Sequence, residues 1–589
     1  MCGICGELRF NNTKITSVRI QDMLESIDSR GPDNTGQYKD DNIFLGHKRL
    51  SVIDISPKSN QPMEDKSLII VFNGVIFNYK ELRNFLVKEG YKFSSDGDTE
   101  VILKCYEHYG EKLVHHLDGV FSFSIYDKQK NELFCARDRL GIKPFYYKYT
   151  QDIFSFSSNT KALLKNEEGI SLDKASLHHQ FTLHSVVPAP NTIISDIHKL
   201  EPGSYMKINS IGQISKHQYY SFNNIKLNTE ISEKEIIDET ERLLLKAIEK
   251  RFYTADVDVG VLLSGGLDSS LIVAMAAKLD LSKVNTFSIG FPTIENEEGN
   301  EFYYSDMVSK KFKTNHHKYN ISQEQLFKSL DDVIKVMPEP MFSQDSAAFY
   351  LLAKEVSSKQ KVVLSGQGAD ELFGGYFWYK KMHDSHGSDI ERFKQYYFDR
   401  EHNSYCDILN KSFVSEDYTS ALIHDLYKNQ PKDISFLDKT LRLDLSTLII
   451  DDPVKRVDSM TMANGLETRV PFLDRDLVEF ILSIPSYKKI ENKGKYYLKK
   501  VAEKYLDKEL IYRDKFYFPV PPLKIIQGQF YNYVKSILTS SACKERRLYN
   551  YEYLEDILAN PNSNFTKLNG NTLWHLGLLE RWLQLNVDS

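Results

Sequence analysis

The stretch Val259-Gly260-Val261-Leu262-Leu263-Ser264-Gly265-Gly266-Leu267-Asp268-Ser269-Ser270 joins an apolar segment to the start of a predicted helix. Its glycine pair allows a tight turn and lets the backbone approach a ligand closely. Ser269 and Ser270 fall where free N–H groups gather at a helix start, and the helix dipole there favours anions. We therefore predict a pyrophosphate-binding loop; the alternative is a Gly-Gly turn followed by a Ser/Asp helix cap.

Asp268 in this loop indicates a cation, because a carboxylate beside phosphate needs Mg²⁺ between them. The sequence has no Gly-x-x-x-x-Gly-Lys-Ser/Thr, which argues against a kinase or GTPase loop. A second loop, Ser365-Gly366-Gln367-Gly368-Ala369-Asp370-Glu371, also follows an apolar segment. Two Gly-rich loops with aspartates at successive strand ends predict an Mg·ATP site at the carboxyl edge of a parallel sheet.

Helices and strands alternate around the first loop. We expect helices at 234–250 and 269–279, and strands at 257–263, 284–289 and 361–364. This alternation predicts an α/β doubly wound parallel sheet.

The first part of the chain follows another pattern, in which short β-type runs are separated by amphipathic stretches. The runs lie at 68–72, 121–126 and 154–157, and the amphipathic stretches at 79–89 and 99–109. Asn73-Gly74 is interpreted as a turn that ends the first run. Strands that flank helices without strict alternation predict an α+β sandwich.

The 589 residues, 41% hydrophobic and 26% charged, are typical of a soluble globular protein with several domains. We expect a first domain at 1–215, a linker at 216–233 and a second domain at 234–589. A net charge of −6 without a long basic stripe disfavours nucleic acid as a partner. The lack of a long apolar run or a secretory signal, with six scattered cysteines, indicates a reduced, cytoplasmic protein without a membrane span. Small molecules are the expected partners, and homodimer formation stays open.

Cys2 becomes the first residue once the initiator methionine is removed. Its α-amine, with a pKa near ~8, can then take the proton of the thiol, with a pKa near ~8.5, so that the thiolate attacks an amide. Asn73 and Gly74 can supply a side-chain amide and a backbone N–H to an oxyanion. Arg49 and Asp98 can hold the carboxylate and the amine of an amino acid.

Two other interpretations of Cys2 stand beside this one. Cys2-x-x-Cys5 has the spacing of a redox or metal pair, although zinc would need two more ligands. Cys2 is otherwise a small buried side chain at a strand start. The residues alone leave the three open.

Motifs in both halves of the chain, taken together and in order, resemble the asparagine synthetase family of glutamine-dependent amidotransferases. The motifs are Met1-Cys2-Gly3-Ile4-Cys5-Gly6, Arg30-Gly31-Pro32-Asp33, His47-Lys48-Arg49-Leu50-Ser51, Asn73-Gly74-x-Ile76-Phe77-Asn78, Ala136-Arg137-Asp138-Arg139-Leu140-Gly141, Ser264 to Ser270, Ser365 to Tyr376 and Met462 to Asp474.

The resemblance implies an N-terminal-nucleophile glutaminase sandwich of αββα layers, followed by an ATP-pyrophosphatase-type synthetase domain. Cys2 would hydrolyse glutamine, and ammonia would cross an internal tunnel to a carboxylate that ATP has activated as an acyl-adenylate. Roles implied in glutamine binding fall on Arg49, Asn73, Gly74 and Asp98. Roles implied in ATP or pyrophosphate binding fall on Ser264, Gly265, Gly266, Asp268, Ser269, Ser270, Ile289, Ser365 and Gly366.

Three further roles follow from the same resemblance. Asp268 and Asp370 match the family's Mg²⁺ ligands, and Ile289 and Gly366 match its adenine pocket. Lys495 aligns with the catalytic lysine, where a fixed cation stabilises charge on the phosphate in the transition state. Other lysines stand close to it in the sequence, at positions 493, 499 and 500.

Two positions depart from the pattern of asparagine-forming relatives. Val75 stands where many members have an acidic residue that contacts the glutamine amine. Gln367 stands where they carry a carboxylate; it forms hydrogen bonds but is no base at neutral pH.

Several stretches look like the N-acetylglutaminylglutamine amidotransferase branch, which makes a compatible solute. They are Met1 to Phe10, Ser365 to Glu371, Asp451 to Asp458, Tyr517 to Pro521 and Leu573 to Glu580. Phe516 after Lys515 departs from that branch, in which a glycine commonly follows the lysine. We expect the acetylated dipeptide as first acceptor and aspartate as second. An RNA-modifying ATP-pyrophosphatase is disfavoured by the acidic composition, and a lone glutaminase would need no ATP.

Overall fold

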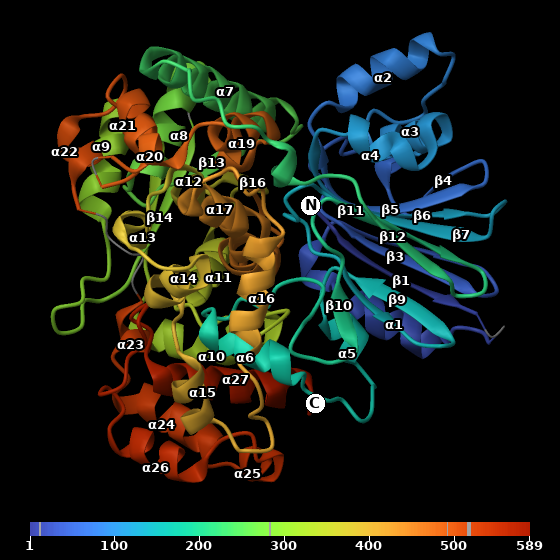
Figure 1. Cartoon of the computed structure of the whole chain (residues 1–589). Helices are drawn as coiled ribbons and strands as arrows, with labels where there is room; N and C mark the ends of the chain where they lie inside the picture. Colours follow the sequence, from blue (N-terminus) through green and yellow to red (C-terminus); the bar gives the residue numbers. More distant parts are fainter. Residues whose placement is uncertain (11–12, 282–283, 492, 515–519, 589) are drawn as a thin grey trace.

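The computed structural model describes residues 1–10, 13–281, 284–491, 493–514 and 520–588 (Figure 1). The dipeptide Lys515-Phe516 and the stretch 517–519, both used in the comparison with the dipeptide branch, lie outside these residues. Among the described helices, none combines the length and apolarity needed to cross a membrane. The chain forms two bodies that lie side by side, and Met1 lies at the junction between them (Figure 1).

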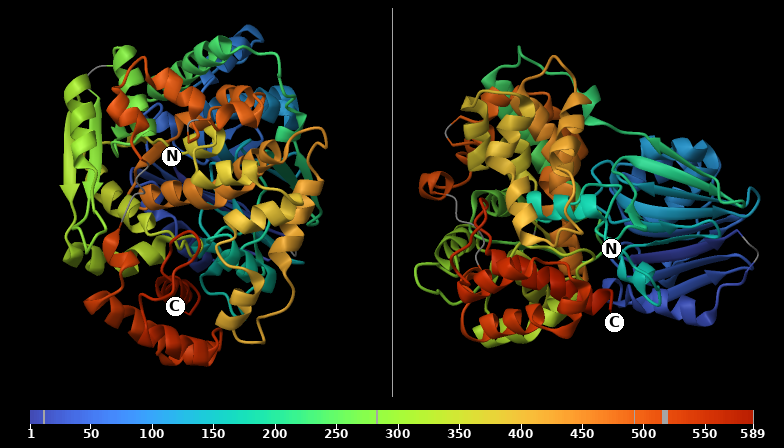
Figure 2. Two further views of the ribbon diagram at one scale, coloured as in Figure 1. Left: turned by 60° about the vertical axis from the view of Figure 1, so that its left-hand side comes forward. Right: turned by 60° about the horizontal axis from the view of Figure 1, so that its bottom comes forward.

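The N-terminal body contains two six-stranded antiparallel sheets stacked face to face (Figure 2, right). The first sheet has the order β10 (Ile197–Lys199), β8 (Tyr146–Tyr149), β9 (Ile153–Ser157), β1 (Gly3–Arg9), β3 (Ile43–Arg49) and β2 (Asn34–Lys39). The second has the order β12 (Ile214–Gln218), β11 (Ser204–Asn209), β7 (Glu132–Arg137), β6 (Gly119–Asp127), β5 (Leu68–Ile76) and β4 (Met63–Asp65).

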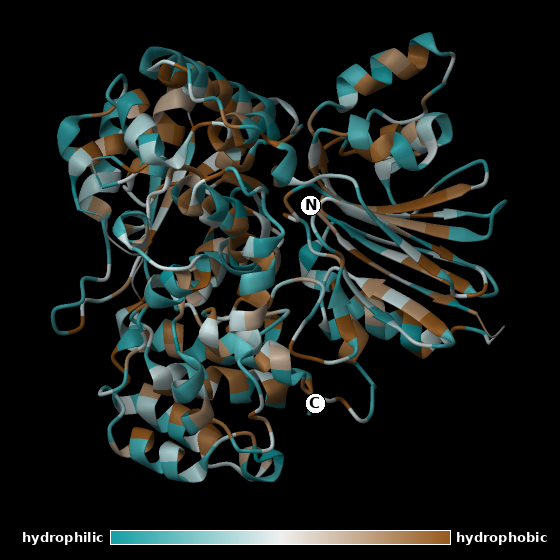
Figure 3. Cartoon of the chain, viewed as in Figure 1, coloured by the Kyte–Doolittle hydropathy of each residue, from teal (hydrophilic) through white to brown (hydrophobic). Residues whose placement is uncertain are grey.

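Successive side chains along a strand point to opposite faces of the sheet, and this alternation produces the layers. In β5, Ile69 and Val71 pack against the first sheet, whereas Ile70 and Phe72 pack against α2 (Tyr79–Lys88) and α3 (Asp98–Tyr109). Helix α1 (Ser17–Glu25) covers the outer face of the first sheet. In Figure 3, most of the brown, hydrophobic colour of the N-terminal body lies on its strands. The helix–sheet–sheet–helix arrangement agrees with the predicted αββα sandwich.

The turn predicted at Asn73-Gly74 is wrong. Strand β5 continues through both residues to Ile76, with Asn73 opposite Ser122 and Gly74 opposite Phe121. Glycine is needed at position 74 for a close approach, because a Cβ there would lie 2.2 Å from the carbonyl oxygen of Val120. A dipeptide typical of turns therefore serves here inside a strand.

The C-terminal body is built on a parallel sheet. Its order is β15 (Asn315–Asn320), β14 (Asn285–Gly290), β13 (Val259–Leu262), β16 (Val362–Leu364) and β17 (Glu467–Arg469). Val261 and Leu263 pack toward α7 (Glu233–Tyr253) and α8 (Leu267–Lys278), whereas Leu262 packs toward α10 (Gln323–Val336) and α11 (Asp345–Val356). Helices thus cover both faces, as the doubly wound prediction requires, and the strands end at one common edge.

Further helices complete both bodies. They are α4 (Leu113–His116), α5 (Lys161–Leu164), α6 (Lys174–Thr182), α9 (Phe302–Phe312), α12 (Ala369–Phe373), α13 (Phe377–Asp384), α14 (Asp389–Tyr397), α15 (His402–Ile408), α16 (Tyr418–Lys428), α17 (Phe436–Leu443), α18 (Lys455–Met462), α19 (Arg475–Leu482), α20 (Ser486–Lys489), α21 (Tyr496–Ala502), α22 (Lys508–Tyr512), α23 (Pro521–Lys524), α24 (Gly528–Leu538), α25 (Ser541–Arg546), α26 (Tyr551–Ala559) and α27 (Thr572–Asn586).

The segment between the bodies is shorter than predicted. Strand β12 runs to Gln218, so the linker expected from residue 216 begins inside a strand. At the other end, Ser232 caps α7 through a reciprocal pair of hydrogen bonds with Glu235, which explains why the helix starts at Glu233.

Candidate active sites

A small cavity of about 30 Å³ lies at Cys2. Residues from both bodies line it. Of the residues predicted for glutamine binding, Arg49, Gly74 and Asp98 line it, as does the predicted nucleophile Cys2, whereas Asn73 does not. Glu467 and Arg469 come from β17 of the C-terminal body. The fold therefore brings together residues that are up to 467 positions apart in the sequence numbering.

Asn73 contacts the backbone of Cys2 through its side chain. The backbone N–H of Cys2 donates to Asn73 Oδ1 at 3.1 Å. Asn73 Nδ2 is buried and has no hydrogen-bond acceptor among the described residues. A buried donor without a partner is unusual in a folded protein, and the predicted oxyanion role needs such a free donor.

Asp98 is a buried carboxylate at the first residue of α3. It accepts a hydrogen bond from the backbone N–H of Ile76 at 3.0 Å. Burial raises the pKa of Asp98 to about 6, and the hydrogen bond from Ile76 opposes this shift. At neutral pH the group is therefore ionised and able to pair with an ammonium group.

Arg49 lines the cavity but also shapes the loop beside it. Its Nη1 donates to the carbonyl oxygen of Ser56 at 2.8 Å and to Asn60 Oδ1 at 2.7 Å, and its Nη2 donates to the carbonyls of Ile53 and Asp54. Most of its donors are thus used within the protein. The sequence prediction of carboxylate binding did not include this second role.

The edge strand β17 closes the cavity. Glu467 Oε2 lies 2.5 Å from the α-amine of Met1, and Glu467 Oε1 accepts from Arg469 Nε at 2.5 Å. All three groups are buried. Burial raises the pKa of the Cys2 thiol, and the nearby α-amine opposes this shift. Glu467 and Arg469 stand in a motif that the sequence singles out, but their role here was missed.

Cys5 does not join Cys2. Its side chain packs with α1 and Phe44 in the outer layer of the first sheet, whereas Cys2 lines the cavity. Both thiols are free. Burial raises the pKa of Cys5 well above its usual range. The arrangement therefore does not support the redox or metal interpretation of the Cys-x-x-Cys spacing.

A second cavity, of about 170 Å³, lies at the carboxyl edge of the parallel sheet. The predicted residues that line it are Ser264, Gly266, Asp268, Ser269, Ile289, Ser365, Gly366, Gln367 and Asp370. Phe287, Phe349 and Leu352 add apolar walls. Gly265 has φ +83°, a conformation that favours glycine at the turn between β13 and α8.

Two predicted residues of the loop do not line this cavity. The carbonyl of Gly265 accepts a hydrogen bond from Arg513 Nη2 at 3.1 Å, and Arg513 also pairs with Glu301 at 2.5 Å. Ser270 is fully buried within α8, where its N–H bonds to the carbonyl of Gly266. Arg513 was not expected from the sequence.

Lys495 joins the two predicted metal ligands. Its Nζ lies 2.7 and 2.9 Å from the oxygens of Asp268 and 2.9 Å from Asp370 Oδ1. These carboxylates raise the pKa of Lys495 above its usual range against the opposing effect of burial. Gly375 permits the approach, because a Cβ there would lie 2.3 Å from Lys495 Cε and 2.4 Å from Asp370 Oδ1.

The neighbouring lysines point elsewhere. The exposed Lys493 pairs with the exposed Asp514, and Lys500 pairs with Glu503. Lys499 is half-buried, and burial together with the charges of Lys495 and Lys493 lowers its pKa to about 8. Of the four lysines, Lys495 is therefore the one held between Asp268 and Asp370.

Asp268 and Asp370 suit Mg²⁺. Their carboxylates converge on one ammonium group next to the phosphate-binding loop. Mg²⁺ in proteins is commonly held by one or two carboxylates together with substrate phosphates. The donor set present therefore fits the predicted ion.

A third and larger cavity, of about 690 Å³, adjoins the second; Asp345, Gln367 and Asp370 line both. Its aromatic walls include Phe342, Tyr376, Trp378, Tyr397 and His575. Its charged groups include His184, Glu371, Asp444, Asp452, Arg456, Lys524 and Lys567. The sequence did not indicate this cavity, because its walls come from segments far apart in the chain.

The charged groups of the large cavity are partly neutralised. Arg456 pairs with Asp345 at 2.9 Å and with Asp452. Burial raises the pKa of Asp444 well above its usual range, and this group accepts a hydrogen bond from Tyr379. The cavity therefore combines flat aromatic surfaces with few uncompensated charges.

Residues 239–584 match the Asparagine synthase family, and residues 1–220 match the Glutamine amidotransferase domain. Asparagine synthetase (glutamine-hydrolyzing) 1 of Bacillus subtilis (strain 168) is 31% identical, with 100% of this chain and 97% of that protein covered. Asparagine synthetase (glutamine-hydrolyzing) 3 of the same organism is 29% identical, with 96% and 94% covered. A putative asparagine synthetase (glutamine-hydrolyzing) 2 of Methanocaldococcus jannaschii is 37% identical, with 64% and 76% covered. The chain therefore belongs to the asparagine synthase family, as a ligase with a glutamine amidotransferase domain in front of the synthase domain.

Proposed function

We propose that this chain transfers ammonia from glutamine to a carboxylate acceptor larger than aspartate, with N-acetylglutaminylglutamine as the first candidate. The observation that carries the proposal is the cavity of about 690 Å³ next to the ATP loops. Pockets of about 300–1,000 Å³ hold ligands of drug size, which suits an acetylated dipeptide.

In the first half-reaction, the Cys2 sulfur attacks the side-chain amide carbon of glutamine once Met1 has been removed. The α-amine of Cys2 takes the thiol proton, and Asn73 Nδ2 and the Gly74 N–H stabilise the oxyanion. The C–N bond then breaks as the α-ammonium returns this proton to the leaving nitrogen, and ammonia leaves. Water then hydrolyses the thioester to glutamate. Asp98 holds the ammonium group and Arg49 the carboxylate of glutamine. Val75 is buried and apolar, so it provides no contact to the amine.

In the second half-reaction, an oxygen of the acceptor carboxylate attacks the α-phosphorus of ATP and pyrophosphate leaves. Ammonia then attacks the acyl carbon and AMP leaves. Lys495 stabilises the charge that grows on the phosphate. Asp268 and Asp370 would hold Mg²⁺, which when bound would supply positive charge to the leaving pyrophosphate. Ile289 and Gly366 face the adenine.

The composition of the large cavity supports an amide-rich acceptor. Tyr376 and Trp378 stack with ring centroids 4.2 Å apart, and they offer a flat surface for peptide groups. Gln367 lies at the junction of the two cavities, where its amide can hydrogen-bond the acceptor without acting as a base. Aspartate is the second candidate, because the relatives above are named asparagine synthetases.

The test measures pyrophosphate release with ATP, Mg²⁺ and glutamine, and compares N-acetylglutaminylglutamine with aspartate as acceptor. Release with the dipeptide alone supports the proposal. Release with aspartate alone contradicts it and makes the chain an asparagine-forming enzyme that works with Gln367.

A substitution in the aromatic wall tests the same point. Trp378→Ala removes a large, mostly buried surface from the cavity. Loss of such stacking and burial costs about 1–2 kcal/mol, so we expect a roughly 10-fold higher KM for the dipeptide with little change in kcat. The matched control is the exposed Tyr253→Ala, which should change neither constant. An unchanged KM in Trp378→Ala would place the acceptor elsewhere.

A further inference from the structure

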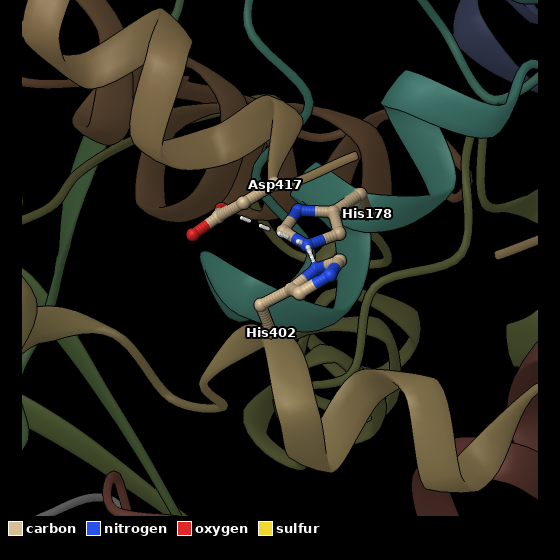
Figure 4. Close-up of side chains that lie close together, drawn as sticks. All are labelled: His178, His402 and Asp417. Atoms are coloured by element: carbon tan, nitrogen blue, oxygen red, sulfur yellow. Dashed lines mark hydrogen bonds and ion pairs between the residues drawn. The ribbon is translucent and has the colours of Figure 1, made fainter. Parts of the chain in front are cut away.

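His178, His402 and Asp417 bring three potential metal ligands together outside the cavities described above (Figure 4). His178 lies on α6, within the residues that match the glutamine amidotransferase domain. His402 opens α15, and Asp417 caps α16, both within the synthase match. The cluster therefore joins one helix of the first domain to two of the second.

The spacing of the three donor atoms suits one ion. His178 Nε2 lies 3.0 Å from His402 Nδ1 and 3.8 Å from Asp417 Oδ1. One donor atom from each residue lies within 4.8 Å of the others. Tetrahedral zinc with bonds of about 2.0–2.1 Å to nitrogen and oxygen separates its ligand atoms by roughly 3.3 Å. Small side-chain movements would therefore complete the geometry.

Outer contacts hold both imidazoles in place. The buried Thr419 hydroxyl lies 2.6 Å from His178 Nδ1, on the side of the ring away from the cluster. The backbone N–H of Thr419 also points at this nitrogen, at 3.4 Å. A bound ion takes the Nε2 lone pair that faces His402 and Asp417, so Nδ1 then carries the proton and donates it to the Thr419 hydroxyl. His402 Nε2 contacts Cys406 Sγ at 3.5 Å, which leaves its Nδ1 for the ion. Metal-binding histidines usually have such partners on their second nitrogen.

We propose that His178, His402 and Asp417 bind a transition-metal ion of the zinc class that ties α6 to α15 and α16. Two imidazoles and one carboxylate suit this class, and the fourth position is taken by water. His178 is fully buried, whereas His402 and Asp417 are half-exposed, so the ion enters from their side. Asp417 Oδ2 pairs with Lys394 at 3.2 Å, and Oδ1 is the oxygen that faces His178.

The test titrates the full chain, freed of metal with a chelator, with Co²⁺ in excess Mg²⁺, followed by displacement with Zn²⁺. Mg²⁺ occupies the Asp268–Asp370 pair. We expect one equivalent of Co²⁺ with the visible absorption of a tetrahedral site. His402→Ala and Asp417→Asn should each weaken binding at least about 100-fold, because even outer partners contribute ~10–100-fold. Asn remains a good helix cap at position 417.

Two further variants distinguish a metal site from a pair of histidines that only form a hydrogen bond with each other. Thr419→Val should weaken Co²⁺ binding by ~10–100-fold without removing a ligand. His424→Ala, an exposed histidine on α16, should leave it unchanged. Zn²⁺ should raise the Tm of the wild type but not of His402→Ala. Absence of one-equivalent binding, or binding that survives His402→Ala, would overturn the proposal.

Discussion

The cavity at Cys2 and the paired cavities of the second domain differ in size and in the origin of their walls. The first measures about 30 Å³ and is closed by Glu467 and Arg469 of the neighbouring domain. The others measure about 170 and 690 Å³, and the predicted ATP residues that line them lie in two loops and on β14 at one sheet edge. The comparison indicates that the cavity at Cys2 depends on the domain interface, whereas the cavity of about 170 Å³ depends on the parallel sheet.

One strand contacts both regions. Arg469 lines the Cys2 cavity through its side chain, and its carbonyl accepts the backbone N–H of Ser365 at 2.9 Å. Ser365 opens the second ATP loop. Arg469 therefore connects the second of the two Gly-rich loops to the cavity at Cys2.

Cys2→Ala is expected to produce the largest difference between glutamine-dependent and ammonia-dependent synthesis. Loss of the nucleophile should lower glutamine-dependent synthesis by at least ~10⁴-fold, because the thioester cannot form. Synthesis with added ammonia should persist, since the second domain is untouched. The two rates are measured as pyrophosphate release. Loss of both in a folded variant would contradict the two-site assignment.

Lys495→Met should produce the opposite pattern. Removing a charge that stabilises the transition state typically lowers kcat ~10²–10³-fold, here with glutamine and with ammonia alike. Glutamate production without ATP should be retained. Lys493→Met is the matched control, because Lys493 pairs at the surface with Asp514. An equal fall in kcat in Lys495→Met and Lys493→Met would contradict a catalytic role for Lys495.

Glu467→Gln probes the dependence of the first site on the second domain. The amide keeps the shape but loses the charge that pairs with Arg469. The Met1 amine that also contacts Glu467 is absent once Met1 has been removed, so the expected effect rests on Arg469. A hydrogen bond to a charged group contributes about 1.5–3 kcal/mol, so glutamine hydrolysis should fall roughly 10–100-fold. Ammonia-dependent synthesis should change little. A fall in both rates would show that β17 supports the ATP site as well.

The smallest effect is a pH dependence of glutamine binding. Burial raises the pKa of Asp98 to about 6, so the carboxylate is ionised above that pH and protonated below it. Protonation removes the partner of the glutamine ammonium group. The KM for glutamine should therefore rise as pH falls through 6, by about 10-fold one unit below the pKa. Asp98→Asn should have a raised KM for glutamine, and this KM should no longer change as the pH falls through 6.

Local patterns predicted much of both sites. The turn after β13 needs a glycine with φ +83°, and the aspartates follow at strand ends, so the ATP loops are recognisable from short stretches. The prediction of a turn at Asn73-Gly74 was wrong because the glycine is required by the close approach of Val120, a residue far away in the sequence. The positions of Glu467 and Arg469 in the wall of the Cys2 cavity were missed for the same reason.

The sequence by itself determined the order of the domains, the parallel sheet and the residues of the ATP loops, because backbone turns and strand ends depend on neighbouring residues. Only the tertiary structure decided which of four lysines reaches Asp268 and Asp370, since ion pairs over more than a hundred positions depend on packing. It also decided the size of the cavity of about 690 Å³ and the cluster of His178, His402 and Asp417. Side chains from remote helices meet there, and no local pattern encodes their distance.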